Sequence, residues 1–165
     1  MPNYSFDVST GADLQEVDNA INQTHKEIAQ RFDFKGTDCT VEFDRAKAAI
    51  RLEADDDFRM KALFDVLQTK LIKRGVPVRN LDMGPDEAAS SGRVRREITL
   101  TQGIPSDTAR QIVKDVKAQK MKKVQIAIQG DELRVSSSSK DALQEVMVFL
   151  RSGDYGIELK FGNYR

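Results

Sequence analysis

Several features that define common protein classes are rare or missing in this chain of 165 residues. A single cysteine, Cys39, excludes an internal disulfide framework. No apolar run approaches the roughly 20 residues that a membrane-spanning helix needs. The opening stretch, MPNYSFDVSTGAD, lacks the basic start and apolar middle of a secretory signal. We therefore expect a cytoplasmic protein with one large domain or two small ones.

Residues suited to catalysis are also scarce. His25 is the only histidine, and its position on the apolar stripe of a helix indicates a structural role at the core edge. Cys39 alternates with Val41 and Phe43, as a small buried hydrophobic residue would. The three aspartates that begin at Asp55 fit a helix start, and no phosphate loop or metal-ligand spacing occurs. The sequence predicts a protein that is not an enzyme and has no cofactor or metal.

Charge of either sign is not in excess, because 26 Lys and Arg residues balance 26 Asp and Glu residues. The distribution is less even. Residues 1–90 carry 12 basic and 17 acidic side chains, whereas residues 91–165 carry 14 and 9. Such a chain could dock half against half, or it could present a basic face to phosphates.

The first half of the chain alternates between strand and helix patterns. Residues 3–9 alternate apolar and polar side chains, as a half-buried strand does. A helix follows, with a capping box expected from Thr10 and Asp13. A hairpin around the tight DRAK connection precedes a second helix, which begins near Asp57 and stops at Gly75. The segment VPVRNLDM fits an edge strand.

A similar order returns after residues 84–92, GPDEAASSG, which have the small and polar composition of a linker. RVRREITLT alternates as a strand, and Ser106 is a good N-cap for the next helix. KVQIAIQ and ELRVS flank the dipeptide GD as a hairpin. Ser138 with Asp141 is expected to start the last helix, and GIELKF closes the chain as a strand.

The resulting order is strand-helix-strand-strand-helix-strand, twice. This order predicts an α+β fold of two tandem ferredoxin-like units, each an antiparallel sheet covered on one face by two helices. The uncovered faces carry polar residues. The third strand of each unit, KAAIRLEA or DELRVSSS, lacks the aromatic residues with which RNA-recognition domains stack bases. Sheet-face RNA binding is therefore not expected, and basic loops are left as the route to RNA.

Several short motifs in a fixed order point to one family. The motifs are RFDFKG, KLIKRG, TLTQGI, QGDELRVSS and the closing GIELKFGNYR. Across essentially its whole length the chain resembles the YajQ family of bacterial nucleotide-binding proteins. The resemblance implies that residues 11–102 form a first domain, completed by strand 93–102. Residues 1–10 and 103–165 then form a second domain, completed by strand 3–9, so that the N-terminal strands are exchanged.

The RFDFKG motif is the leading candidate for a nucleotide site, because the resemblance implies binding of cyclic di-GMP or other nucleotides without a known reaction. Arg31 and Lys35 could contact phosphate, and Phe34 could stack on a base. Asp33 could accept hydrogen bonds from a guanine edge, and Gly36 would allow close backbone approach. In the alternative reading, Phe32 extends the helix stripe, Phe34 enters the core, and the charges are solvated.

Three basic clusters compete for the phosphates of such a ligand. They are Lys70, Lys73 and Arg74; Arg93, Arg95 and Arg96; and Lys120, Lys122 and Lys123. Lys73, Arg74, Arg95, Lys122 and Lys123 complete the candidate nucleotide-binding set with the RFDFKG residues. Each cluster alone is also typical of a solubilising patch.

Our hypothesis is a non-enzymatic cyclic di-GMP effector that acts through a protein partner. Its ligand would lie at the FDFKG corner or between the two units. The alternatives are a nucleic-acid-associated module that uses basic loops, and an enzyme acting on nucleotides.

Overall fold

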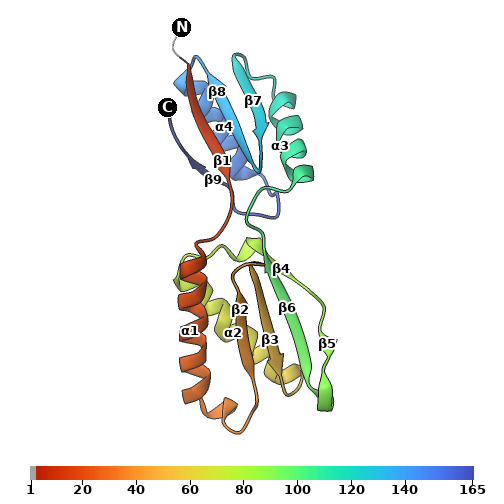
Figure 1. The fold of residues 1–165 in the computed structure, drawn as a ribbon. Coiled ribbons are helices and arrows are strands. Elements are labelled where there is room, and N and C mark those ends of the chain that lie inside the picture. The colour runs from red at the N-terminus through yellow and green to blue at the C-terminus, as the bar shows by residue number, and fades with distance from the viewer. Residues whose placement is uncertain (1–2) are drawn as a thin grey trace. The chain divides into compact units, whose positions relative to one another are not determined.

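The computed structural model describes residues 3–165, and the chain divides into two compact units. Of the described residues, 3–11 and 102–165 make up unit 1, and 12–101 make up unit 2. Each unit combines one sheet with two helices, and Figure 1 shows the helices beside the strands in each. The predicted fold class, α+β with two antiparallel sheets and four helices, is confirmed. Among the described residues, no helix has the length and apolarity needed to cross a bilayer.

The sheet of unit 2 has the order β2-β3-β6-β4, and all its pairings are antiparallel. Its strands are β2 (Thr40–Asp44), β3 (Ala49–Ala54), β4 (Leu81–Met83) and β6 (Val94–Leu100), with β5 (Glu87–Ala88) also paired to β6. The helices are α1 (Leu14–Gln30) and α2 (Asp57–Lys73). The short 3₁₀ turns of this unit are η1 (Phe32–Phe34), η2 (Val78–Asn80) and η3 (Ser90–Gly92).

The sheet of unit 1 has the order β7-β8-β1-β9, again antiparallel. Its strands are β1 (Tyr4–Ser9), β7 (Val124–Gln129), β8 (Glu132–Ser137) and β9 (Lys160–Gly162). The helices are α3 (Ser106–Ala118) and α4 (Lys140–Ser152). The first strand of the chain therefore pairs with strands from its last third, whereas β6 pairs with strands that precede it in unit 2.

Each unit has its own core, built from the apolar stripes of its helices and the inward side chains of its strands. The alternation of strand residues explains this, because successive side chains point to opposite faces. The fully buried side chains of unit 2 include Ile50, Leu52, Leu63, Leu67, Leu71 and Ile98. Those of unit 1 include Phe6, Val8, Ile112, Leu133, Val135 and Val146.

The start of α1 differs from the expected capping box. Asp13 is the N-cap, and its carboxylate accepts a hydrogen bond from the backbone N–H of Gln15. Thr10 instead donates its hydroxyl to the carbonyl of Glu158, at 2.6 Å. The predicted Thr10–Asp13 box is therefore wrong, because Thr10 belongs to unit 1 and its hydroxyl is bonded there.

Two other helix starts are displaced by one residue. Ser106 is the first residue of α3, since Pro105 takes the capping position without a side-chain hydrogen bond. Ser139, not Ser138, caps α4 by accepting from the N–H of Ala142. Neighbouring serines are chemically equal candidates for a cap, so the backbone path decides between them.

Residues 84–92 are not a free linker. The N–H of Gly84 donates to the carbonyl of Glu97 at 2.9 Å, and that of Ala89 donates to Arg93 at 2.8 Å. Strand β5 pairs with β6 between these two bonds. The segment therefore runs along the edge of the unit 2 sheet. The chain passes from one unit to the other at residues 11–12 and 101–102.

Candidate functional site

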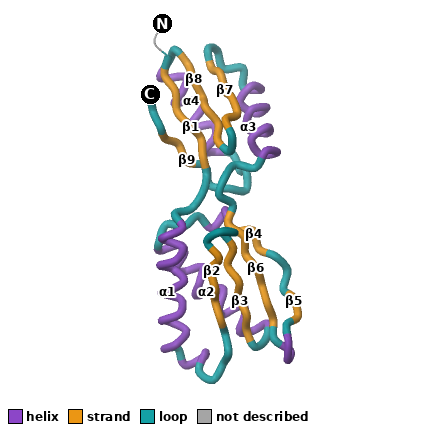
Figure 2. The backbone as a smooth tube through the Cα atoms, viewed as in Figure 1, coloured by secondary structure: helices purple, strands orange, loops and turns teal. Residues whose placement is uncertain are grey.

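The segment between α1 and β2 forms a tight corner at one end of unit 2 (Figure 2). Helix α1 ends at Gln30 because Arg31 is extended, with ψ 134°, and η1 follows. Gly36 then has φ +79°, a left-handed conformation that favours glycine. The Thr37 hydroxyl donates to the carbonyl of Phe34 at 2.6 Å and closes the turn.

An open hollow of about 410 Å³ lies between this corner and the end of α1. The volume is within the range of small-molecule sites, roughly 300–1,000 Å³. The lining residues are His25, Ile28, Ala29, Phe34, Lys35, Gly36, Thr37 and Cys39. We call this the corner hollow. Three of the ten candidate nucleotide-binding residues, Phe34, Lys35 and Gly36, therefore line one cavity.

The two phenylalanines of the motif have opposite environments. Phe32 is 88% exposed, whereas Phe34 is 4% exposed and joins the core of unit 2. The alternative that Phe32 extends the helix stripe is wrong, because α1 ends two residues earlier. Phe34 presents little of its ring to the corner hollow, and the guanidinium of Arg31 lies 5.2 Å from the ring centroid. Any base held here would thus contact Phe34 over a small area.

Arg31 and Asp33 are bound to each other. The guanidinium donates twice to the carboxylate, at 2.9 and 2.5 Å, and once to Glu27 at 3.4 Å. Because of these charge-assisted bonds, Arg31 holds the pKa of Asp33 below its ordinary value. Glu27 also binds Lys70 at 2.9 Å, and Lys70 lowers the pKa of Glu27. A phosphate would have to displace Asp33 to gain both donors of Arg31.

Lys35 is the cation of the corner hollow that is not held by a carboxylate. Its side chain is exposed, and it has no ion pair with any residue in the described part of the chain. The neighbouring Gly36 has no atom within 4 Å of the position that a Cβ would occupy. A charged ligand group could therefore approach the backbone at Gly36 and the ammonium of Lys35 together.

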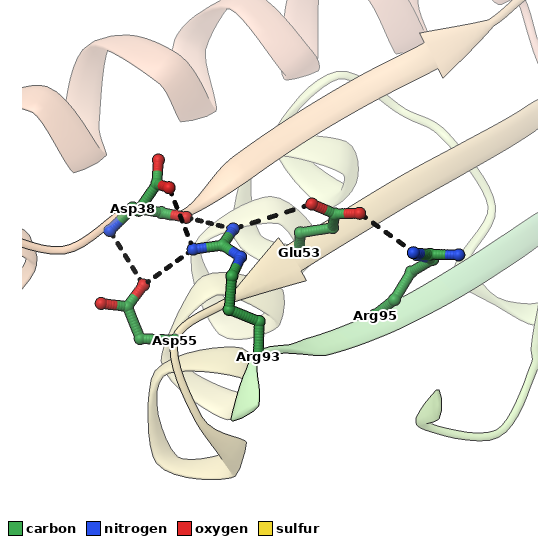
Figure 3. A network of polar contacts seen from close by, with 5 residues as sticks. All are labelled: Asp38, Glu53, Asp55, Arg93 and Arg95. Carbon is green, nitrogen blue, oxygen red and sulfur yellow. Dashed lines mark hydrogen bonds and ion pairs between the residues drawn. The ribbon is translucent and has the colours of Figure 1, made fainter. Parts of the chain in front are cut away.

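An ionic network holds the chain at Asp38, where it leaves the corner (Figure 3). Arg93 donates to the backbone carbonyl of Asp38 at 2.5 Å and lies 3.1 Å from its carboxylate. The same guanidinium is 3.5 Å from Asp55 and 3.7 Å from Glu53. Asp55 in turn accepts the N–H of Asp38 at 2.8 Å. The network thus ties the chain after Gly36 to the ends of β3 and β6.

The other arginines of this cluster are also paired. Arg95 contacts Glu53 at 3.1 Å, directly across the β3–β6 pairing. Arg96, on the opposite face, binds Asp86 at 2.7 Å and lies over the ring of Phe64. This arrangement follows the alternation of the strand. Candidate residue Arg95 is therefore placed on the open sheet face, in an existing ion pair.

The remaining candidate cations are distributed between the two units. In unit 2, Arg74 lies 3.6 Å from Glu16, whereas Lys73 is exposed. Lys122 and Lys123 belong to unit 1 and are exposed in the turn before β7, where Lys123 has φ +66°. None of these four residues lines the corner hollow.

His25 and Cys39 line the corner hollow although neither was a candidate. The Nε2 atom of His25 lies 2.7 Å from the carbonyl of Val41, so this nitrogen donates to β2. The ring is exposed, and Cys39 is half-buried where full burial was expected. The spacing of His25, Ile28 and Ala29 along one helix face was the available sequence signal, since residues three and four apart are neighbours.

The open sheet faces offer no aromatic platform. The aromatic residues of the described strands, Tyr4, Phe6, Phe43 and Phe161, pack against the two cores. On the outward face of unit 1, Arg134 binds Asp7 at 3.0 Å and lowers its pKa. No group of three or more His, Cys, Asp or Glu side chains within residues 3–165 is placed to hold a metal ion.

Comparison with known proteins places the chain among close relatives. A family model described as "Nucleotide-binding protein YajQ-like" matches residues 4–165. A protein of Koribacter versatilis (strain Ellin345), named a nucleotide-binding protein, is 46% identical over 165 residues, 100% of this chain and 99% of the relative. A nucleotide-binding protein of Geotalea uraniireducens (strain Rf4) is 49% identical over 161 residues, 98% of each. One from Chloroherpeton thalassium (strain ATCC 35110 / GB-78) is 44% identical over 162 residues, 98% of each.

Proposed function

The chain belongs to the YajQ-like family of nucleotide-binding proteins, and we propose on this basis that it binds a nucleotide at the corner hollow. The observation that carries the proposal is the coincidence of a cavity of about 410 Å³ with an unpaired cation, Lys35, and a glycine turn. Small-molecule sites typically combine an apolar wall with a few convergent polar groups. The corner hollow has both.

The residues of the corner contact different parts of the ligand. Lys35 and the backbone at Gly36 receive a phosphate, and Ile28, Ala29 and the exposed part of Phe34 form the apolar wall for a base. The Thr37 hydroxyl already donates to Phe34, which leaves its oxygen to accept from the ligand. Recognition therefore does not require Arg31 and Asp33 to separate first.

The guanidinium of Arg31 would bind a second phosphate of the ligand, and cyclic di-GMP, GTP and ATP each carry one. When such a group takes the guanidinium of Arg31, Asp33 is released and becomes free to accept hydrogen bonds from a guanine edge. The exchange changes the charge and shape of the corner only when ligand is bound. A ligand shifts a conformational equilibrium by its differential affinity, so this exchange is what a protein partner would read.

We propose binding without turnover, in a cytoplasmic effector. Two observations support the absence of turnover. The curated relatives are named for nucleotide binding. His25, the one histidine, is engaged through Nε2 with a backbone carbonyl, so this nitrogen is not available as a general base. Incubation of the pure protein with labelled GTP, ATP and cyclic di-GMP should leave every nucleotide intact.

Calorimetry with cyclic di-GMP, GTP and ATP tests the proposal. We expect heat with at least one of them, and a loss of affinity of about tenfold in Lys35→Gln, because a charge-assisted bond is removed. Lys26→Gln is the matched control, since Lys26 is an exposed lysine of α1 outside the corner hollow. Absence of heat with all three ligands up to about millimolar concentration would remove the proposal.

A second candidate function, contact with RNA through basic loops, is favoured by one observation. The exposed lysines Lys120, Lys122 and Lys123 of unit 1 have no ion pair with any described residue. Phosphate contacts would give an affinity that falls linearly with salt on a log–log scale. A protein that does not bind single-stranded RNA at about 50 mM salt is not such a module.

A further inference from the structure

The exposed edges of the two sheets are not protected equally. Strands β4, β5 and β9 have only two or three residues, and β2 carries two acidic side chains. Strand β7, VQIAIQ, has six residues and neither a charge nor a proline. Natural proteins usually shorten edge strands or place charges on them, because an open edge can pair with another chain. Strand β7 uses none of these devices.

The outer side of β7 offers backbone hydrogen bonds. Gly130, with φ +64°, opens a two-residue turn in which Gln129 is opposite Glu132. In such a hairpin the closing pair is hydrogen-bonded and the next is not. The N–H and C=O groups of Val124, Ile126 and Ile128 therefore point away from β8. Among the described strands, β7 pairs with β8 alone. Figure 1 shows β7 at the sheet edge beside α3.

A second hollow, of about 600 Å³, lies along this edge. Its walls combine apolar residues of α3 and β7 with polar residues of these elements and of β8. The lining residues are Val116, Lys117, Lys120, Met121, Val124, Gln125, Ile126, Ala127, Gln129, Arg134 and Ser136. We call the strand and this hollow the β7 edge. The lining has no aromatic ring on which a base could stack, but it can receive the alternate side chains of an extended peptide.

The lysines around the β7 edge have no ion pair with any described residue. Five lie within ten residues, namely Lys114, Lys117, Lys120, Lys122 and Lys123. The nearby carboxylate of Asp115 already accepts hydrogen bonds from Tyr155 and Gln111. A surface that pairs with a second copy of itself must be self-complementary. The β7 edge is not, because pairing would bring two lysine-rich surfaces together.

We propose that the β7 edge docks an extended acidic segment of a partner protein, which adds to the sheet as a fifth strand. Backbone bonds to Val124, Ile126 and Ile128 would supply affinity, as in other strand-addition complexes. Lys117 and Lys120 would select for acidic side chains. The surface belongs to unit 1, and the proposal does not depend on nucleotide binding in unit 2.

The probe is a capped peptide of about seven residues in which Glu alternates with Val, titrated into the ¹⁵N-labelled full chain. We expect amide shifts concentrated on residues 124–129, with an affinity that falls as salt is added. The same peptide with Lys in place of Glu, or with alternate backbone nitrogens methylated, should give no shifts, because charge or hydrogen bonding is lost.

Two variants of α3 sharpen the test. Lys117→Glu should weaken binding of the acidic peptide by about threefold to tenfold, whereas Lys114→Glu should leave it nearly unchanged. Both lysines are exposed on the same helix, and only Lys117 lines the hollow. Nucleotide calorimetry on Lys117→Glu should match the unaltered protein, which separates the two proposals.

Four results would overturn the proposal. They are no shifts up to about 5 mM acidic peptide, equal binding of the lysine peptide, stronger shifts of residues 124–129 with single-stranded RNA, or a concentration-dependent dimer that occupies β7. The last two would assign the β7 edge to nucleic acid or to a second copy of the chain.

Discussion

The two units have the same architecture but use their cations differently. In unit 2 the ion-paired residues are Arg31, Arg45, Lys70, Arg74, Arg93, Arg95 and Arg96. In the described part of unit 1 they are Arg110 and Arg134. One unit uses its cations to organise a corner, and the other leaves a run of lysines free. The comparison shows that one architecture carries two different placements of charge, and in proteins generally it is such placement on loops, more than the fold, that determines function.

The charge asymmetry of the sequence changes when it is counted by unit. When the chain is divided at residue 90, the net charges of the two halves differ strongly. When it is divided by unit, residues 12–101 carry 15 basic and 17 acidic side chains, and the remaining residues carry 11 basic and 9 acidic ones. Arg93, Arg95 and Arg96 account for most of the difference, because they belong to β6 and its approach in unit 2. They are paired there with Asp38, Glu53, Asp55 and Asp86.

The largest effects should come from the cores, where the two units are alike. Leu67→Ala in unit 2 and Leu150→Ala in unit 1 remove side chains that are 0% and 1% exposed. Each should lower the free energy of unfolding by about 2–5 kcal/mol, measured by denaturant titration. Ile72→Ala is the control, because Ile72 is 57% exposed and should change little. A small loss in only one core would show that the units are not equivalently packed.

The next effect should distinguish the two ionic patterns. Arg93→Ala leaves Asp38 and Asp55 without their shared partner, and we expect a loss of about 1–3 kcal/mol in unfolding free energy. Hydrogen exchange at residues 36–40 should accelerate as well. In unit 1, Arg110→Ala breaks an exposed pair with Asp107 and should cost less than about 0.5 kcal/mol. Equal losses of unfolding free energy in both variants would show that the ion pairs of the two units do not differ in their contribution to stability.

Alkaline titration should affect unit 1 through Tyr155. Burial and the hydrogen bond to Asp115 raise the pKa of Tyr155 from 10.0 to about 12. The folded state holds this proton more tightly than the unfolded state does. The contribution of Tyr155 to the free energy of unfolding is therefore fully present below pH 10 and is lost as the pH rises toward 12. We expect a loss of about 1 kcal/mol over this range, after allowance for solvent exposure. Tyr155→Phe should abolish that part of the pH dependence. An unchanged profile would contradict the assignment.

The smallest effect concerns the pair that faces the proposed ligand. Asp33→Asn frees Arg31 for phosphate, so the affinity for ATP, which has no guanine edge for Asp33 to bind, should rise about twofold to fivefold by calorimetry. Asp65→Asn removes the same charge from an exposed position without an ion pair and is the control. A matching rise in both variants would mean that net charge, rather than the release of Arg31, controls affinity.

Much of the fold can be predicted from the sequence, because alternating apolar and polar residues in strands and apolar stripes on helices indicate which side chains are buried. The strand that contains Phe6 and Val8, and the helix that contains Leu63 and Leu67, are examples. Helix starts are less certain, since Ser138 and Ser139 are chemically equivalent caps. The pairing of β5 is hidden by its polar composition, because it depends on β6 and not on local residues.

The sequence predicts the candidate site only in part. A glycine turn with a lysine beside it is a local signal, and the structure places Lys35 and Gly36 on the corner hollow. The pairing of Arg93 with Asp38 joins residues 55 positions apart, and no local pattern contains it. The exposure of Phe32 follows from the extended conformation of Arg31, which helical periodicity does not report.

Amide chemical-shift mapping of the full ¹⁵N-labelled chain with cyclic di-GMP, GTP and ATP tests the central claim most directly. We predict that the responding amides cluster at residues 29–39 of unit 2, and that Lys35→Gln weakens the response. Saturating shifts confined to the lysine turn of unit 1, or no shifts with any of the three nucleotides, would contradict the claim.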